Sequence, residues 1–134
     1  MQRRWSHETH LAAEPTSASQ ARAFVCRHLL AHDLAGMVGE IQVVVSELAT
    51  NAVLHAQTPF TVSLRAFDAT LRLEVVDGSN LMPLMVVAGP LDLRGRGVAT
   101  VQALSQDWGV LAHTADGKSV WAEFDIPRPH TSTL

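Results

Sequence analysis

Apolar residues recur at helical spacing in two stretches of the first half of the chain. The first predicted helix starts near residues 14–17, where hydroxyl side chains suit a helix cap, and Gly36 breaks it. A second helix is predicted over residues 37–55, and Thr58-Pro59 ends it. Each helix collects its apolar residues on one face, which is the face expected to pack against the sheet. These residues are Ala21, Phe24, Val25 and Leu29 in the first helix, and Ile41, Val44, Val45, Leu48 and Ala52 in the second.

Alternating or β-rich runs predict five strands. The first is a weakly alternating edge strand, and the other four form two hairpins. The connecting segments are 67–69 in one hairpin and the turn Ala115-Asp116-Gly117-Lys118 in the other. In chain order, the predicted strands are 5–12, 60–66, 70–76, 108–113 and 119–126.

The segment between the two hairpins contains a long loop and a third helix. Residues 78–94 predict the loop, and a connection of that length is usually functional. Residues 97–105 have the apolar pattern of a helix. The separate groups of helices and strands predict an α+β fold, with the helices packed on one face of a mixed, mostly antiparallel sheet. We expect one domain at residues 1–126 and a mobile tail at 127–134.

Composition narrows the range of functions. The chain has 134 residues, of which 47% are hydrophobic, which is enough for the core of one domain. A formal charge of −3 and a pI near 6.1 give no basic surface for nucleic acid. Residues 1–8 lack the apolar core of a signal peptide, and the longest apolar run, 81–88, is too short to span a membrane. Because the single cysteine, Cys26, cannot form an internal disulfide, we expect a cytoplasmic protein.

The most informative pair of polar residues is Glu47 and Asn51, in the second predicted helix. Their spacing of four residues stacks both side chains on one helix face. A carboxylate beside an amide oxygen suits Mg²⁺ and a water next to it. The same spacing is also common on a solvated helix face, so the pair gains its weight from two later segments.

Those later segments are Asp77-Gly78-Ser79-Asn80, at the end of a strand, and Gly95-Arg96-Gly97, at the start of a helix. Backbone N–H groups at a helix N-terminus bind phosphate, and glycine allows a close approach. Asp77 can accept a hydrogen bond from an exocyclic amine such as that of adenine. Each motif has a simpler explanation as a turn, but together the three segments indicate a nucleotide site.

The order of these motifs resembles the bacterial anti-sigma-factor serine kinases. The matching segments are Glu47-Leu48-x-x-Asn51-Ala52-x-x-His55, Asp77-Gly78-Ser79, Gly95-Arg96-Gly97-Val98, Trp108-Gly109 and Gly117-Lys118-Ser119-Val120-Trp121. That family belongs to the GHKL, or Bergerat-fold, ATPase superfamily, which also contains the histidine kinases. The resemblance implies a two-layer α/β sandwich of the Bergerat type that uses ATP and Mg²⁺.

The resemblance also implies a role for each matched residue. Glu47 would act as the catalytic base or orient a water, and Asn51 would hold Mg²⁺. Asp77 would bind adenine, with the Ser119 hydroxyl supporting it through a water. Residues 81–94 would form the lid over the nucleotide. The remaining nucleotide contacts would come from His55, Ser79, Gly95, Arg96, Gly97 and Val98.

One departure from the family pattern is clear. The superfamily's Asp-x-Gly-x-Gly box reads Asp77-Gly78-Ser79-Asn80-Leu81, so both box glycines are absent. Two other sites are not supported. His28 and His32 with Cys26 lack the second ligand pair of a zinc site, and no Gly-x-Ser-x-Gly motif of a hydrolase occurs.

We therefore expect an ATP-binding regulator that resembles anti-sigma factors with serine/threonine kinase activity. Its partners would be a sigma factor and a STAS-type anti-sigma antagonist that accepts the γ-phosphate. The alternative is a non-catalytic binding module with ATP as a structural or switching ligand, which the altered glycine box favours and the Glu47/Asn51 pair opposes. A detached histidine-kinase catalytic domain is a third, weaker alternative. Whether the protein forms a homodimer stays open.

Overall fold

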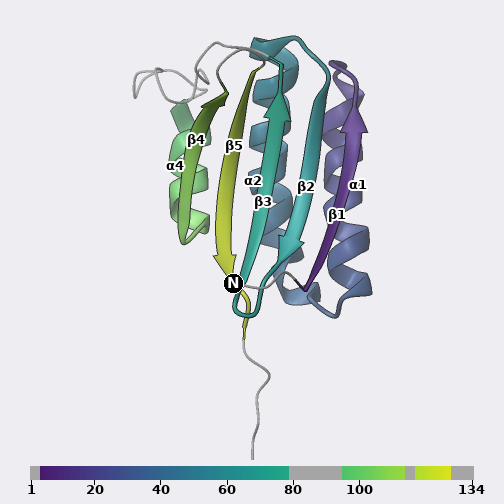
Figure 1. Ribbon diagram of the computed structural model, residues 1–134, viewed down its shortest axis with the longest axis vertical. Coiled ribbons are helices and arrows are strands. Elements are labelled where there is room, and N and C mark those ends of the chain that lie inside the picture. Colours follow the sequence, from purple (N-terminus) through teal and green to yellow (C-terminus); the bar gives the residue numbers. More distant parts are fainter. Residues whose placement is uncertain (1–3, 79–94, 114–116, 128–134) are drawn as a thin grey trace, which may run out of the picture.

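Five strands form one antiparallel sheet in the computed structural model, which describes residues 4–78, 95–113 and 117–127 (Figure 1). Their order across the sheet is β1-β2-β3-β5-β4. Every pairing among these described strands is antiparallel, so the sheet is more uniform than the mixed sheet expected from the sequence. The strands are β1 (Trp5–Leu11), β2 (Phe60–Ala66), β3 (Thr70–Asp77), β4 (Asp107–His113) and β5 (Gly117–Asp125).

The described helices cover one face of this sheet, which confirms the predicted two-layer α+β architecture (Figure 1). α2 lies between α1 and α4 and contacts both. The 3₁₀ turn η1 leads into α2, and the π-helical turn η2 continues it. The bounds are α1 (Thr16–Ala31), η1 (Ala35–Met37), α2 (Val38–Asn51), η2 (Ala52–Ala56) and α4 (Gly95–Leu104).

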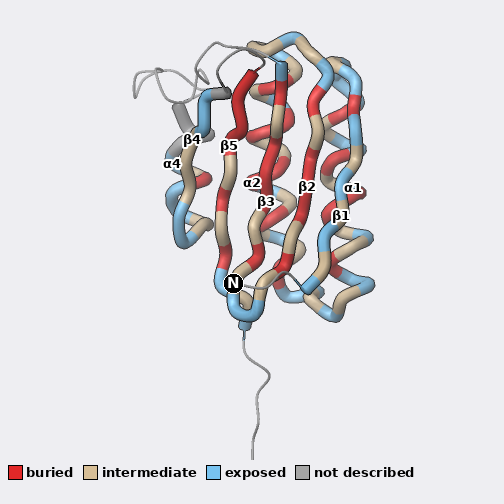
Figure 2. The backbone as a smooth tube through the Cα atoms, in the orientation of Figure 1, coloured by how far each residue is buried: buried red, intermediate tan, exposed pale blue. Residues whose placement is uncertain are grey.

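The core lies between the two layers. Buried and more exposed residues alternate along β3 except at Glu74, which is also buried, and this pattern is expected for a sheet covered on one face (Figure 2). The predicted apolar faces of α1 and α2 meet these strands. The fully enclosed side chains include Val25 and Leu29 of α1, Ile41, Val44 and Val45 of α2, Val62 and Leu64 of β2, and Leu71 and Leu73 of β3.

The central helix is unusually apolar. The helical stretch Ala35–Ala56 has 22 residues and could cross a membrane by length and composition alone. In the structure, however, Ile41, Val45 and Leu48 on this stretch are buried in the core between the helices and the sheet. Core packing therefore accounts for its apolar composition.

α1 ends earlier than the sequence predicts. Asp33 adopts a left-handed conformation with φ of 61°. The Asp33 N–H then donates to the carbonyl of Leu30, and the Leu34 N–H donates to that of Leu29. These two bonds form a Schellman motif, in which Asp takes the position usually held by glycine. The prediction that Gly36 breaks the helix was therefore wrong, because the chain has already turned at Asp33 and Gly36 lies in η1.

Candidate functional site

Segments that are far apart in the sequence meet at one end of the sheet. β3 ends there at Asp77 and β5 begins there at Gly117 (Figure 1). The turn η2, which follows α2 directly, contacts β3, and α4 runs alongside α2. The strand order is the cause, because it places the end of β3 next to the start of β5 beneath the helix layer.

Glu47 and Asn51 lie one turn apart on α2, and both are half-buried, as their place at the edge of the apolar stripe predicts. The Asn51 side-chain nitrogen donates a hydrogen bond of 3.0 Å to the backbone carbonyl of Glu47. This bond uses the amide nitrogen, and the second polar atom of the side chain is the amide oxygen. Oxygen is the ligand atom that Mg²⁺ prefers.

Glu47 is reachable from the outer surface of the helix layer. It lines a shallow groove between α1 and α2 with Arg22, Gln42, Val43 and Ser46. The Arg22 guanidinium donates to Ser46 Oγ at 2.9 Å, and the Gln42 side chain donates to the Arg22 carbonyl at 3.1 Å. A carboxylate at this position is accessible to a group presented by a second molecule.

The turn η2 carries His55 beyond the end of α2. Gln57 ends this π-helical turn in a left-handed conformation, with φ of 58° and ψ of 31°. The Gln57 N–H donates to the carbonyl of Ala52 at 3.0 Å. Helical turns of this type are rare and often occur at functional sites. His55 is half-buried and lies one turn further along the helix than Asn51.

Asp77 is held by a residue that the sequence analysis gave no role. Lys118 lies directly opposite Asp77 in the β3–β5 pair. Its Nζ contacts the two carboxylate oxygens at 3.0 and 2.9 Å. Both residues are only 5% exposed, so this is a buried ion pair between two cross-strand neighbours.

Glycine is required beside this pair. Gly117 has φ of 119°, a conformation that favours glycine. A Cβ atom at Gly117 would lie 1.9 Å from the carbonyl oxygen of Asp77. On the other side, the Gly78 N–H donates to Thr58 Oγ1 at 2.9 Å. These contacts fix the backbone on both sides of Asp77.

Ser119 follows the direct register partner of Asp77. In the β3–β5 register it lies opposite Val76, while Lys118 lies opposite Asp77. Successive side chains on a strand point to opposite faces, so Ser119 and Asp77 belong to different faces of the sheet. The expectation that the Ser119 hydroxyl assists Asp77 through a water stays a prediction.

Part of the predicted site lies outside the described residues. Ser79 and the lid segment 81–94 belong to this part, and at Gly95, Arg96, Gly97 and Val98 only the backbone is described. The backbone of α4 begins at Gly95, the first residue of the predicted phosphate motif. The phosphate contacts expected at this helix N-terminus stay a prediction.

Residues 11–124 match the family model of the histidine kinase-like ATPase domain, which covers well over half of the chain. The chain belongs to the histidine kinase-like ATPase family. This assignment agrees with the α+β sandwich and with the motif order described above. A comparison with curated proteins gave no match.

The residues of this histidine kinase-like ATPase domain fit a magnesium nucleotide. Asn51 carries an amide oxygen, its amide nitrogen is bonded to the helix backbone, and the Glu47 carboxylate lies one turn before it. Mg²⁺ usually takes only one or two protein oxygens and completes its shell with phosphates and waters. The fixed carboxylate of Asp77 is the acceptor that an adenine amine needs.

The histidines considered for a zinc site form a ring stack. The ring centroids of His28 and His7 are 3.8 Å apart, and those of His32 and Trp5 are 3.9 Å apart. His7 and His32 are joined by an Nε2–Nε2 hydrogen bond of 3.0 Å. Burial lowers the pKa of His7 and of His28, and the neighbouring histidines and Arg27 lower it further. Within the described ranges, no three His, Cys, Asp or Glu side chains could jointly hold a metal.

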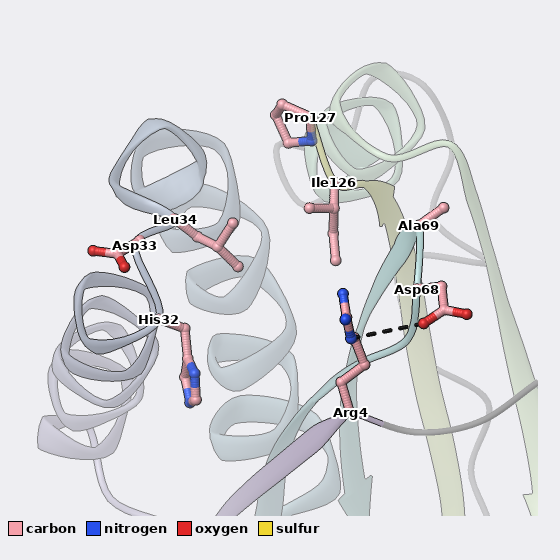
Figure 3. A pocket seen from close by; sticks show the side chains of 8 residues that line it. All are labelled: Arg4, His32, Asp33, Leu34, Asp68, Ala69, Ile126 and Pro127. Carbon is pink, nitrogen blue, oxygen red and sulfur yellow. Dashed lines mark ion pairs between the residues drawn. The ribbon is translucent and has the colours of Figure 1, made fainter. Parts of the chain in front are cut away.

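A separate cavity of about 690 Å³ lies at the opposite end of the sheet, near the hairpin between β2 and β3 (Figure 3). Arg4 points into it and forms an exposed ion pair with Asp68, with 3.7 Å between Nε and Oδ1. The other residues that line it are His32, Asp33, Leu34, Ala69, Ile126 and Pro127. Because Asp77 lies at the far end of β3, this cavity is not part of the candidate nucleotide site.

Proposed function

We propose that this protein is an ATP-binding regulator with Mg²⁺-dependent serine/threonine kinase activity. It transfers the γ-phosphate of ATP to a hydroxyl of a STAS-type anti-sigma antagonist and sequesters a sigma factor, in the cytoplasm. The observation that carries the proposal is the placement of Glu47 and Asn51 on α2, next to the sheet end that holds Asp77.

Each of these residues has a distinct task in phosphoryl transfer. Asp77 accepts a hydrogen bond from the adenine amine and so fixes the base. The N-terminus of α4 holds the phosphates, and Asn51 supplies an oxygen to Mg²⁺, which neutralises charge on the phosphates when bound. The arrangement fixes the γ-phosphate near Glu47, and positioning of this kind provides most of the rate in such reactions.

Glu47 receives the proton of the acceptor hydroxyl. The hydroxyl oxygen forms a bond to the γ-phosphorus while the bond from that phosphorus to the β–γ bridging oxygen breaks, which leaves ADP. The groove beside Glu47 supports this role, because a protein substrate must bring its hydroxyl in from outside. A positioned base of this type typically contributes about 10²–10⁴ in rate.

The alternative function is a binding module that uses ATP as a structural or switching ligand. The absence of both box glycines between Asp77 and Leu81 favours it. The Glu47/Asn51 pair opposes it, because a module that only binds a partner has no need of a carboxylate beside the proposed metal ligand.

Phosphoryl transfer to a partner isolated from the host tests the proposal. Partners are co-purified with the full chain, identified by mass spectrometry, and incubated with the protein and labelled Mg·ATP. We expect label on a Ser or Thr of a STAS-type protein. A STAS-type partner that binds but receives no phosphate would support the non-catalytic alternative, and the absence of any STAS-type partner would refute the assignment.

A further inference from the structure

The end of the sheet that is proposed to bind adenine contains a second charged group, the Lys118 ammonium. Its contacts of 3.0 and 2.9 Å to the Asp77 carboxylate place it within hydrogen-bond distance of both oxygens. The Lys118 side chain is 7% exposed and that of Asp77 is 4% exposed. Water therefore screens this pair little, and the ammonium controls the orientation of the carboxylate.

The pairing of the two strands places Asp77 and Lys118 opposite each other. Asp77 and Lys118 are register partners, and the close approach of Gly117 to the Asp77 carbonyl locks that register. The strand ends are thus held by the backbone, and a pair of apolar side chains could fill the same place. Replacing a buried ion pair by apolar residues is often neutral or stabilising, so stability alone does not account for the pair.

An ion pair at this place has a consequence for base recognition. Without its ammonium partner a buried carboxylate turns toward water, and the fixed acceptor is lost. A carboxylate accepts about four hydrogen bonds, so two contacts to one ammonium do not by themselves exhaust it. The ammonium can thus hold the carboxylate in one orientation and still allow it to accept a hydrogen bond from an amine.

We propose that Lys118 is a positioning residue for adenine recognition, which holds the Asp77 carboxylate as a fixed acceptor for the exocyclic amine. The inference rests on the proposed function, because it requires that the protein binds ATP through Asp77. Lys118 acts through Asp77, so its effect should depend on the base and should vanish when Asp77 no longer carries a carboxylate.

Calorimetric titration of the full chain tests this with three probes: Mg·ATP, Mg·GTP and magnesium triphosphate, which has no base. Lys118→Met should weaken ATP binding by about ten- to a hundredfold, the range for a hydrogen bond to a charged group. It should also bring the ATP and GTP affinities together and leave the triphosphate affinity unchanged. Lys118→Arg, which keeps the cation, should retain the preference for ATP.

Asp77→Asn provides the background in which Lys118 should have no further effect. Asp77→Asn and the double variant Asp77→Asn/Lys118→Met should bind ATP equally, as a double-mutant cycle requires of residues that act as one unit. This comparison remains informative if Lys118→Met alone does not fold. Equal ATP affinity in Lys118→Met and wild type, equal weakening for all three probes, or a further loss in the double variant would each overturn the inference. If the wild-type protein binds no ATP, the proposed function itself fails.

Discussion

Asp77 and Lys118 lie directly opposite each other on β3 and β5, and the Lys118 ammonium contacts both oxygens of the Asp77 carboxylate. Both charges are buried, and the two groups form an ion pair with each other. Removing one charge therefore differs from removing both, because a lone buried charge is far more costly than a neutral pair. This asymmetry can be measured without any ligand.

Lys118→Met should destabilise the nucleotide-free protein by about 3–5 kcal/mol, since it leaves the Asp77 carboxylate buried without its cation. The matched control is the double variant Asp77→Asn/Lys118→Met, which removes both charges and should lose clearly less. Denaturant unfolding monitored by circular dichroism gives the free energies of unfolding. A single variant as stable as the wild type would show that the ion pair does not form in solution.

Glu47→Gln should separate catalysis from binding. The amide keeps the shape of the side chain but cannot take a proton, so the rate of phosphoryl transfer should fall by about 10²–10⁴. ATP affinity and partner binding should stay close to wild type. Glu40→Gln, on the same helix and two turns earlier, is a suitable control and should leave the transfer rate unchanged. Full transfer by Glu47→Gln would remove Glu47 from the mechanism.

Asn51→Ala should abolish the Mg²⁺-dependent part of ATP binding, because it removes the amide oxygen proposed as the metal ligand. Titrations with ATP in the presence of Mg²⁺ and in the presence of a chelator separate the magnesium-dependent part of the affinity from the magnesium-independent part. The wild-type protein should bind more tightly with Mg²⁺, and the variant should bind equally weakly in both. A variant that retains the magnesium effect would place the ion elsewhere.

The histidine stack between β1 and α1 should make folding stability depend on pH. The pKa values of His7 and His28 lie below the ordinary value of 6.5, chiefly because the rings are partly buried. The unfolded chain therefore binds protons that the folded protein resists. The free energy of unfolding keeps its full value above the ordinary histidine pKa and falls as the pH drops through it. It levels off below the lowered pKa values of the folded protein.

Denaturant unfolding between about pH 7.5 and pH 5.5, the range in which unperturbed histidines titrate, measures this dependence. His28→Gln should reduce the slope, because it removes one ring from the stack. His10→Gln is the control, since His10 lies on the same strand as His7 and bonds to Thr61 on the other face of the sheet. Equal slopes in the wild type and in His28→Gln would contradict the assignment.

The order and type of the helices and strands could be predicted from the spacing of apolar residues in the sequence. The apolar stripe that ends at Ala52 and the β-rich runs on both sides of residues 67–69 each depend on local spacing alone, and the structure confirms them. The end of α1 could not be predicted in the same way, because it depends on the left-handed conformation of Asp33. A prediction that looks only for glycine at helix ends misses an Asp in this role.

The geometry of the site could be predicted from the sequence only for residues that lie on the same helix or strand. Glu47 and Asn51 share a helix, so their spacing fixes their geometry. Asp77 and Lys118 are 41 residues apart, and their contact depends on the register of β3 with β5. A shift of one residue exchanges the faces of a strand, so a motif that contains both Lys118 and Ser119 does not say which of them lies beside Asp77.

Calorimetric titration of the wild-type protein with Mg·ATP tests the central claim, that this end of the sheet is a nucleotide site. We expect saturable binding of one nucleotide per chain, tighter for ATP than for GTP, because guanine presents a carbonyl oxygen where Asp77 requires a donor. No binding of Mg·ATP at millimolar concentration would contradict the account, and equal affinity for the two nucleotides would exclude Asp77 from base recognition.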